Sequence, residues 1–324
     1  MTRLVLALVV ALIVAVPLVA LLAGDDDGPP GPPAPVDAAA LDAWIAAEVP
    51  SSPLAGRARA FVRAGLANDI DPRALLAIAR HESVLGTAGS GRDIHNAFGW
   101  GPAIPFTSWE ENVAVVARGL RTGYLDDGRT TLTRIAARWA PVGAPNDPQG
   151  LNTSWVGAVR AGYAALGGDP DRAITLTAQA RAMGGPTRGA GGLATPTGGA
   201  GTMGGGPGEG THAHGEGPDD WQSDRAVDIE MPFGSPVWAV DAGTVVRVAG
   251  DPERTEGRFG GARLTLVTGD DAYFYAHLAG VMVRPGQRVE RGALLGFSGA
   301  ANGVDHLHLG VRRRDPVAVT GLAS

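Results

Sequence analysis

Two histidines spaced two residues apart near the carboxyl end of the chain are the first candidates for chemistry. His306 and His308 flank Leu307, and on a β-strand such side chains point to the same face of the sheet. His277 follows an aromatic run over 273–275, which is typical of a strand. Imidazole nitrogens bind metal ions and transfer protons near neutral pH. This spacing therefore predicts a metal or proton-transfer site on a sheet.

Two aspartates precede these histidines in the chain. Asp224 and Asp228 lie four residues apart, before a loop that contains Pro and Gly. A catalytic zinc ion takes three nitrogen or oxygen ligands and leaves one position open to water. A histidine that is not a ligand can hold the proton or stabilise the transition state. The residue types of the whole group are thus those of a catalytic zinc site.

A glutamate in the amino-terminal half is a separate candidate. The apolar spacing over 75–83 predicts a helix that ends near Glu82, and a Gly-rich loop follows over 96–101. Desolvation at such a helix end can raise the pKa of a carboxyl group. The acid could then protonate a glycosidic oxygen. Taken alone, however, this pattern is more typical of a solvated helix end.

Composition and periodicity predict that the chain of 324 residues is a multidomain protein. The chain has 49 Gly and 24 Pro, and they are densest in two segments that cannot form a core. We predict an N-terminal transmembrane helix or signal over 1–24, a Pro-rich spacer over 25–40, a mainly-α domain over 41–167, a Gly-rich linker over 168–218, an all-β domain over 219–316 and a tail over 317–324.

Capping patterns predict where the helices of the first domain begin. Ser52 with Pro53 predicts one start, Asp71 with Pro72 a second, and Ser108 with Glu111 a capping box. Further helices are expected over 130–139 and 154–166, and residues 171–183 form either a short helix or the beginning of the linker. From Trp221 on, β-branched and aromatic runs separated by Gly and Asp predict strands.

The amino terminus and the charge limit the location and the partners. Residues 4–23 are apolar apart from Pro17, with Arg3 before them and Asp25 to Asp27 after them. This predicts a single membrane anchor with the remaining chain outside the cytoplasm; the alternative is a cleaved signal and a secreted protein. The net charge of -6 argues against nucleic-acid binding. Nothing in the sequence indicates an oligomeric state.

The first domain resembles the lysozyme-like glucosaminidases that cut bacterial peptidoglycan. The resemblance covers roughly residues 41–166 and rests on the ordered segments LLAIARHES, NAFGWG, FTSWEENV and WAP. It implies that Glu82 is the general acid and that a sugar cleft is lined by Phe98 and Trp100. The second carboxylate stays open among Asp93, Glu110 and Glu111, so hydrolysis and a transglycosylase route are both possible.

The β domain resembles the lysostaphin-type zinc endopeptidases, which cut peptide cross-links of peptidoglycan. The resemblance covers roughly residues 221–314 and rests on AVDIEMPFGSPVWAVDAGTV, YAHL, VRPGQRVERGALLGFSGA and DHLHLGV. It implies that Asp228 and His308 bind zinc. It also implies that His277 and His306 act as general base or stabilise the transition state.

The sequence departs from that family at the first ligand. The family pattern is His-x-Gly-x-Asp, whereas this chain has Asp224 in the place of the His and Ala226 in the place of the Gly. Three readings remain open. Asp224 binds zinc with Asp228 and His308; or the domain holds no metal and only binds wall peptides; or His212 or His214 of the linker is a ligand.

Both of the families that the chain resembles act on the same polymer, peptidoglycan. We therefore expect a membrane-anchored peptidoglycan hydrolase that cuts glycan strands through Glu82 and cuts or binds peptide cross-links through the zinc-type site. The alternative is a non-catalytic wall-binding or scaffold protein with a degenerate metallopeptidase domain. The sequence does not choose between cell division, conjugation and a prophage as the setting.

Overall fold

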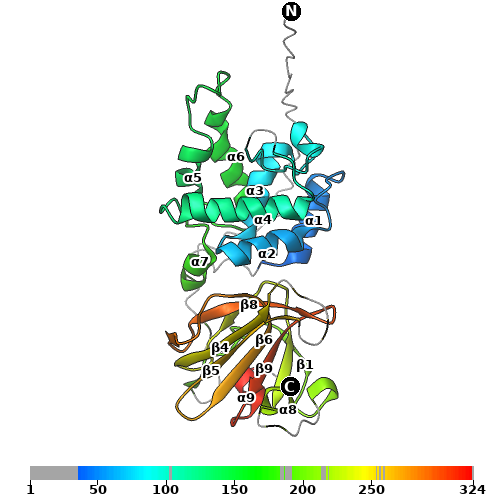
Figure 1. Cartoon of the computed structure of the whole chain (residues 1–324), viewed down its shortest axis with the longest axis vertical. Coiled ribbons are helices and arrows are strands. Elements are labelled where there is room, and N and C mark those ends of the chain that lie inside the picture. Colours follow the sequence, from blue (N-terminus) through cyan, green and yellow to red (C-terminus); the bar gives the residue numbers. More distant parts are fainter. Residues whose placement is uncertain are drawn as a thin grey trace, which may run out of the picture. The chain divides into compact units, whose positions relative to one another are not determined.

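A computed structural model gives the architecture of the chain. Helices come first and a β-sheet follows (Figure 1), so the predicted order of a helical region and an all-β domain is confirmed. The structure describes residues 36–101, 104–182, 192–212, 219–252 and 260–322, together with residues 186, 217, 254 and 257.

Seven α-helices and a π-helical turn build the described part of the first region. The core of this region contains fully buried side chains such as Leu75, Ile78 and Val116. Helix α3 packs against α6, and α2 packs against α4. The helices are α1 (Ala38–Glu48), α2 (Ala58–Asn68), α3 (Pro72–Ser83), α4 (Trp109–Leu120), α5 (Leu132–Trp139), α6 (Asn152–Ala165) and α7 (Leu176–Ala182), with the π-helical turn η2 (Arg121–Leu125) after α4 and the 3-10 turn η1 (Ser90–Arg92) after α3.

Helix α3 begins where the sequence predicts. Asp71 is its N-cap and accepts a hydrogen bond from the Arg73 amide at 2.9 Å. The same carboxylate is fully buried, where it binds the Arg73 guanidinium and accepts the Tyr163 hydroxyl at 2.7 Å. Burial and the neighbouring Asp71 carboxylate raise the pKa of Tyr163 far above its ordinary value. This buried group joins α3 to α6 and so fixes the helix whose end carries Glu82.

One predicted helix start differs from the structure, and another is confirmed with one hydrogen bond changed. The helix expected at Ser52 begins instead at Ala58, because Gly56 adopts a φ of +76°, which helix geometry does not allow. The predicted start at Ser108 is confirmed, since Ser108 is the N-cap of α4. At α4 the Ser108 hydroxyl accepts from the Glu111 amide as a capping box requires. The Glu111 carboxylate, however, accepts from the Thr107 amide and not from that of Ser108.

Part of the predicted linker is ordered. Strand β1 (Thr202–Gly205) pairs antiparallel with β2 (Ala226–Glu230), and the 3-10 turn η4 (Gly210–His212) follows it. The ambiguous stretch over 171–183 contains α7. Local composition does not predict strand β1. Its pairing partner, β2, lies more than 20 residues farther along the chain, so the pairing leaves no local pattern in the sequence.

The second region is a single antiparallel sheet in which β1, β2, β9, β8, β6, β5, β4 and β7 are neighbours in that order. Strand β3 pairs with β8, and β9 also pairs with β6. The short helix α8 precedes β2, and α9 occupies part of the predicted C-terminal tail. The bounds are β3 (Pro236–Trp238), β4 (Gly243–Asp251), β5 (Gly261–Val267), β6 (Ala272–Val281), β7 (Arg288–Val289), β8 (Leu294–Ala301), β9 (Val304–Val311), α8 (Trp221–Asp224) and α9 (Pro316–Thr320).

Among the helices of the described residues, none is long and apolar enough to cross a membrane. The anchor predicted over 4–23 lies outside the described residues.

The buried Asp71 group gives a stability prediction. Asp71→Ala should lower the free energy of unfolding of the helical region by about 3 kcal/mol, because it removes an N-cap and leaves the Arg73 guanidinium buried without its carboxylate. Urea denaturation followed by Trp fluorescence measures this change. The matched control is Asp171→Ala, because Asp171 is exposed and pairs with Arg160 at the surface; it should cost less than about 1 kcal/mol. Equal effects of the two substitutions would contradict this role of Asp71.

Candidate active site

Strand pairing brings the predicted residues of the β region together. In the register of β2 with β9, Asp228 is directly opposite His308. In the register of β6 with β9, His308 is opposite Ala276, the neighbour of His277. His306 lies two residues before His308 on the same strand. The i, i+2 spacing of these histidines therefore does place both imidazoles beside the same carboxylate.

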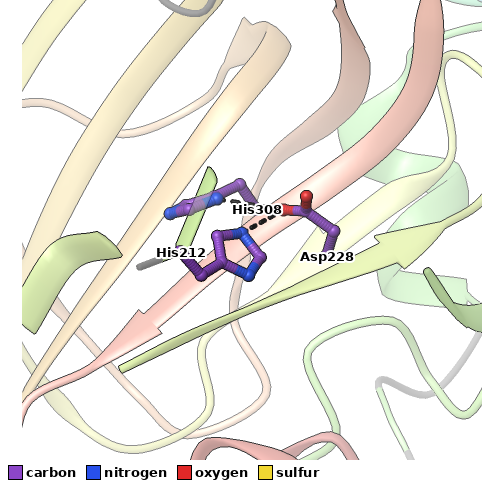
Figure 2. A group of neighbouring side chains, drawn as sticks. All are labelled: His212, Asp228 and His308. Carbon is purple, nitrogen blue, oxygen red and sulfur yellow. Dashed lines mark hydrogen bonds and ion pairs between the residues drawn. The ribbon is translucent and has the colours of Figure 1, made fainter. Parts of the chain in front are cut away.

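One oxygen of Asp228 is the centre of the group. Its Oδ1 atom lies 3.0 Å from Nδ1 of His308, 3.2 Å from Nε2 of His212 and 3.7 Å from Nε2 of His306. Figure 2 shows His212 and His308 each joined to the Asp228 carboxylate by a dashed line. Ligand atoms of His212, Asp228 and His308 all lie within 4.8 Å of one another. These three side chains could hold a metal ion.

The electrostatics of the group follow from this contact. Burial by itself would raise the pKa of the Asp228 carboxyl, but the adjacent imidazoles of His212 and His308 hold that pKa well below its ordinary value. The same carboxylate raises the pKa of the His212 imidazole, and burial opposes it. Asp228 is thus an anion at neutral pH, as a metal ligand must be.

His277 and His306 form the other half of the site. Their rings lie 4.7 Å apart. Nδ1 of His277 is 2.8 Å from the Gly260 carbonyl, and Nδ1 of His306 is 3.0 Å from the Val304 carbonyl. A carbonyl only accepts, so each Nδ1 carries the hydrogen and each Nε2 keeps a lone pair. Burial lowers the pKa of His277 to about 4, which makes this imidazole a neutral acceptor at pH 7.

The backbone and a pocket mark the same place. His277 has a φ of +60°, in the left-handed region that residues other than glycine adopt rarely. It also lines a pocket of about 820 Å³ together with His306, His308 and Asp228. Strained backbone is often retained at functional sites. The pocket gives a substrate access to both halves of the group.

Asp224 does not join Asp228 and His308 as one reading of the sequence expected. It lines the pocket, but of the described residues the group with ligand atoms in mutual reach contains His212 and not Asp224. The reason is local: Asp224 is the last residue of α8, whereas Asp228 lies on β2. The two aspartates therefore belong to different elements. His212, which the sequence offered only as one of two linker histidines, takes part instead.

In the helical region, Glu82 lies at the end of α3. Its Oε1 atom accepts hydrogen bonds from two indoles, Nε1 of Trp139 and Nε1 of Trp155, each at 2.7 Å. The other oxygen, Oε2, faces Gly99, where an added Cβ would lie 3.7 Å from it. Trp139 lies on α5 and Trp155 on α6. The structure makes them the groups that hold the Glu82 carboxylate.

The two residues predicted to line a sugar cleft differ in position. Phe98 is 1% exposed and its ring centre lies 6.3 Å from that of Phe61, so the structure places it in the core and not on a cleft surface. Trp100 is half-buried, and its ring centre lies 5.4 Å from that of Trp139. Trp100 therefore lies one aromatic ring away from Glu82. The sequence around Phe98 is a Gly-rich loop, and its pattern of apolar residues does not decide whether the Phe98 side chain is buried or exposed.

The candidates for a second carboxylate have separate surroundings. Asp93 is exposed. On α4, Glu110 pairs with Arg57, and Glu111 accepts from Thr107. Each of these glutamates thus has a structural partner of its own.

Comparisons with known proteins concern the β region. Residues 222–319 match the family described as Peptidase family M23. A comparison with curated proteins finds no match.

Solved structures are similar over part of their length. The antimicrobial peptidase lysostaphin from Staphylococcus simulans is 26% identical, with a TM-score of 0.28, 34% of this chain covered and 42% of that chain. A zinc-containing peptidase from Vibrio cholerae is 30% identical, with a TM-score of 0.25, 30% of this chain covered and 29% of that chain. This chain thus spans less than half the length of either. The match of residues 222–319 identifies the β region as a domain of the Peptidase M23 type, and it does not extend to the helices.

Proposed function

We propose that this chain is a peptidoglycan hydrolase whose β region cleaves peptide cross-links with the help of zinc. The observation that carries the proposal is the contact of Asp228 with His308 beside two further imidazoles, His277 and His306, within a domain that matches Peptidase family M23. A wall substrate also agrees with a location outside the cytoplasm, which the apolar segment over 4–23 supports as an anchor or a signal.

The residues present fit a zinc ion. Nε2 of His308 lies 2.7 Å from the Gln222 carbonyl and therefore donates to it, so Nδ1 is the nitrogen that faces Asp228 Oδ1 and that would bind the ion in its deprotonated form. Imidazole nitrogen and carboxylate oxygen are zinc ligands, and a backbone carbonyl that fixes the other imidazole nitrogen is typical of metal-binding histidine. Asp228 and His308 would thus supply two of the three protein ligands.

The chemistry divides between the ion and the chain. Zinc, when bound, supplies a Lewis acid that polarises the scissile amide carbonyl and acidifies a water molecule. His277 and His306 present Nε2 lone pairs on the pocket side, because their Nδ1 atoms are held by backbone carbonyls. Either imidazole can take the proton of the attacking water and return it to the leaving amine.

A second candidate function, cleavage of glycan strands, rests on Glu82. The two indole N–H groups orient the carboxylate through one oxygen, and the other oxygen faces Gly99. Trp100 and Trp139 form an aromatic pair beside it, and such rings can stack on sugars. This arrangement suits a fixed acid that protonates a glycosidic oxygen, with Trp139 and Trp155 as positioning residues.

The peptidase proposal predicts a defined product. The full chain with zinc should release new peptide amino groups from purified peptidoglycan, and a chelator should abolish them. His306→Ala should slow this release by about 100-fold or more, because proton transfer by a positioned side chain contributes at least that much. Mass spectrometry of the products measures both effects. Release that continues in chelator, or is unchanged in His306→Ala, would contradict the proposal, and no release from several wall types would favour the scaffold alternative.

The glycosidase proposal predicts new reducing sugar ends that persist in chelator. Glu82→Gln should reduce them by about 100-fold or more, because the amide cannot donate the proton. The matched control is Glu48→Gln, since Glu48 is a glutamate at the end of α1 that pairs with Arg80. Equal loss in both variants, or none in Glu82→Gln, would refute this role of Glu82.

A further inference from the structure

We infer that His212, which precedes the part of the chain matched to the peptidase family, is the third ligand of the zinc site and takes the place that the family pattern gives to residue 224. This inference rests on the proposed zinc peptidase function. The ligands of the metal site would then come from both the β domain and the Gly-rich segment before it.

The surroundings of His212 indicate a ligand. The side chain is 2% exposed, and its Nδ1 atom lies 3.0 Å from the Gly206 carbonyl, to which it donates. Its Nε2 atom is buried and makes no hydrogen bond of good geometry with any described residue. That atom nevertheless lies 3.2 Å from Asp228 Oδ1. A buried nitrogen beside a carboxylate is unfavourable unless a proton or a metal cation lies between them, so this contact suits a site that binds a cation.

His308 repeats this arrangement from the other side. Its Nε2 donates to the Gln222 carbonyl, so Nδ1 is the nitrogen that faces Asp228 Oδ1 and that can bind a cation when it is deprotonated. Three lone-pair atoms thus converge within 4.8 Å. Ligand atoms about 2 Å from a tetrahedral zinc ion lie about 3.3 Å from one another. The distances of 3.2 Å and 3.0 Å from the two imidazole nitrogens to Oδ1 are close to this value.

The fold explains how a Gly-rich segment delivers a fixed ligand. Strand β1 pairs with β2 so that Gly205 is opposite Asp228. The turn that follows is closed by two hydrogen bonds, from the His212 amide to the Glu209 carbonyl at 2.8 Å and from the Gly206 amide to the Glu209 carboxylate at 3.1 Å. The His212 and His308 ring centres are then 5.0 Å apart. His212 is therefore positioned by pairing with the strand that carries Asp228.

The ligand set also changes the charge at the ion. With Asp224, two carboxylates would neutralise zinc and make a nearby water less acidic. With His212, two neutral imidazoles and one carboxylate leave a net positive site, which suits zinc better than a site dominated by oxygen. The loss of a histidine at position 224 is thereby compensated by one that is not in the family motif.

Zinc binding by the full chain tests the inference without any activity assay. Isothermal titration against a competing chelator should give one site in the unaltered chain. His212→Ala should weaken the affinity by about 100-fold or more, since even the loss of a residue that only orients a ligand costs about 10-fold to 100-fold. Asp224→Ala is the matched control and should change the affinity less than threefold. The opposite ranking, or equal affinities in all three proteins, would overturn the inference.

A rescue variant separates ligation from folding of the segment. His212→Cys should restore tight zinc binding and, with Co²⁺, should give a thiolate-to-cobalt charge-transfer band. The chain contains no Cys, so this band can come from position 212 alone. A variant that binds Co²⁺ without the band would overturn the inference.

The proposed function can fail independently. If the unaltered chain binds no zinc and His308→Ala makes no difference, both the zinc peptidase proposal and this inference are refuted. If His308→Ala abolishes binding but His212→Ala does not, the peptidase proposal survives and this inference is refuted.

Discussion

The contact of a single oxygen, Oδ1 of Asp228, with surrounding imidazoles is the interaction on which the rest of the β region depends. Strand β2 must pair with β9 in the register that sets Asp228 opposite His308, and β1 must pair with β2 for His212 to approach. A shift of one residue in either pairing would turn these side chains to the other face. The carboxylate is half-buried, so its charge is stabilised by partners there.

The backbone carbonyls around the site have a common role. Gly206, Gly260 and Val304 each accept from one imidazole Nδ1, and the Gln222 carbonyl accepts from Nε2 of His308. In its neutral form, each of these imidazoles therefore keeps a lone pair on its other nitrogen. The site is thus organised in advance for binding a cation and for accepting protons, and the side chains need no rearrangement of their hydrogen bonds.

The sequence predicts those parts of the site that depend on local periodicity. The i, i+2 spacing places His306 and His308 on one strand face, and the Asp71 cap with Pro72 starts the helix that ends at Glu82. Local periodicity does not predict which strands pair when they lie far apart in the chain. A Gly-rich composition predicts no strand over 202–205, so neither the order of this segment nor the approach of His212 to Asp228 follows from local patterns. For the same reason two indoles more than 50 residues from Glu82 could not be assigned to it.

The central proposal is that His212, Asp228 and His308 together bind zinc. Extended X-ray absorption fine structure at the zinc edge of the zinc-loaded full chain measures that set directly, because imidazole rings give characteristic multiple scattering. Ligation by His212, Asp228 and His308 predicts two imidazoles together with oxygen ligands. A spectrum that requires one imidazole and otherwise oxygen would match a site with Asp224 in place of His212, and it would contradict this proposal.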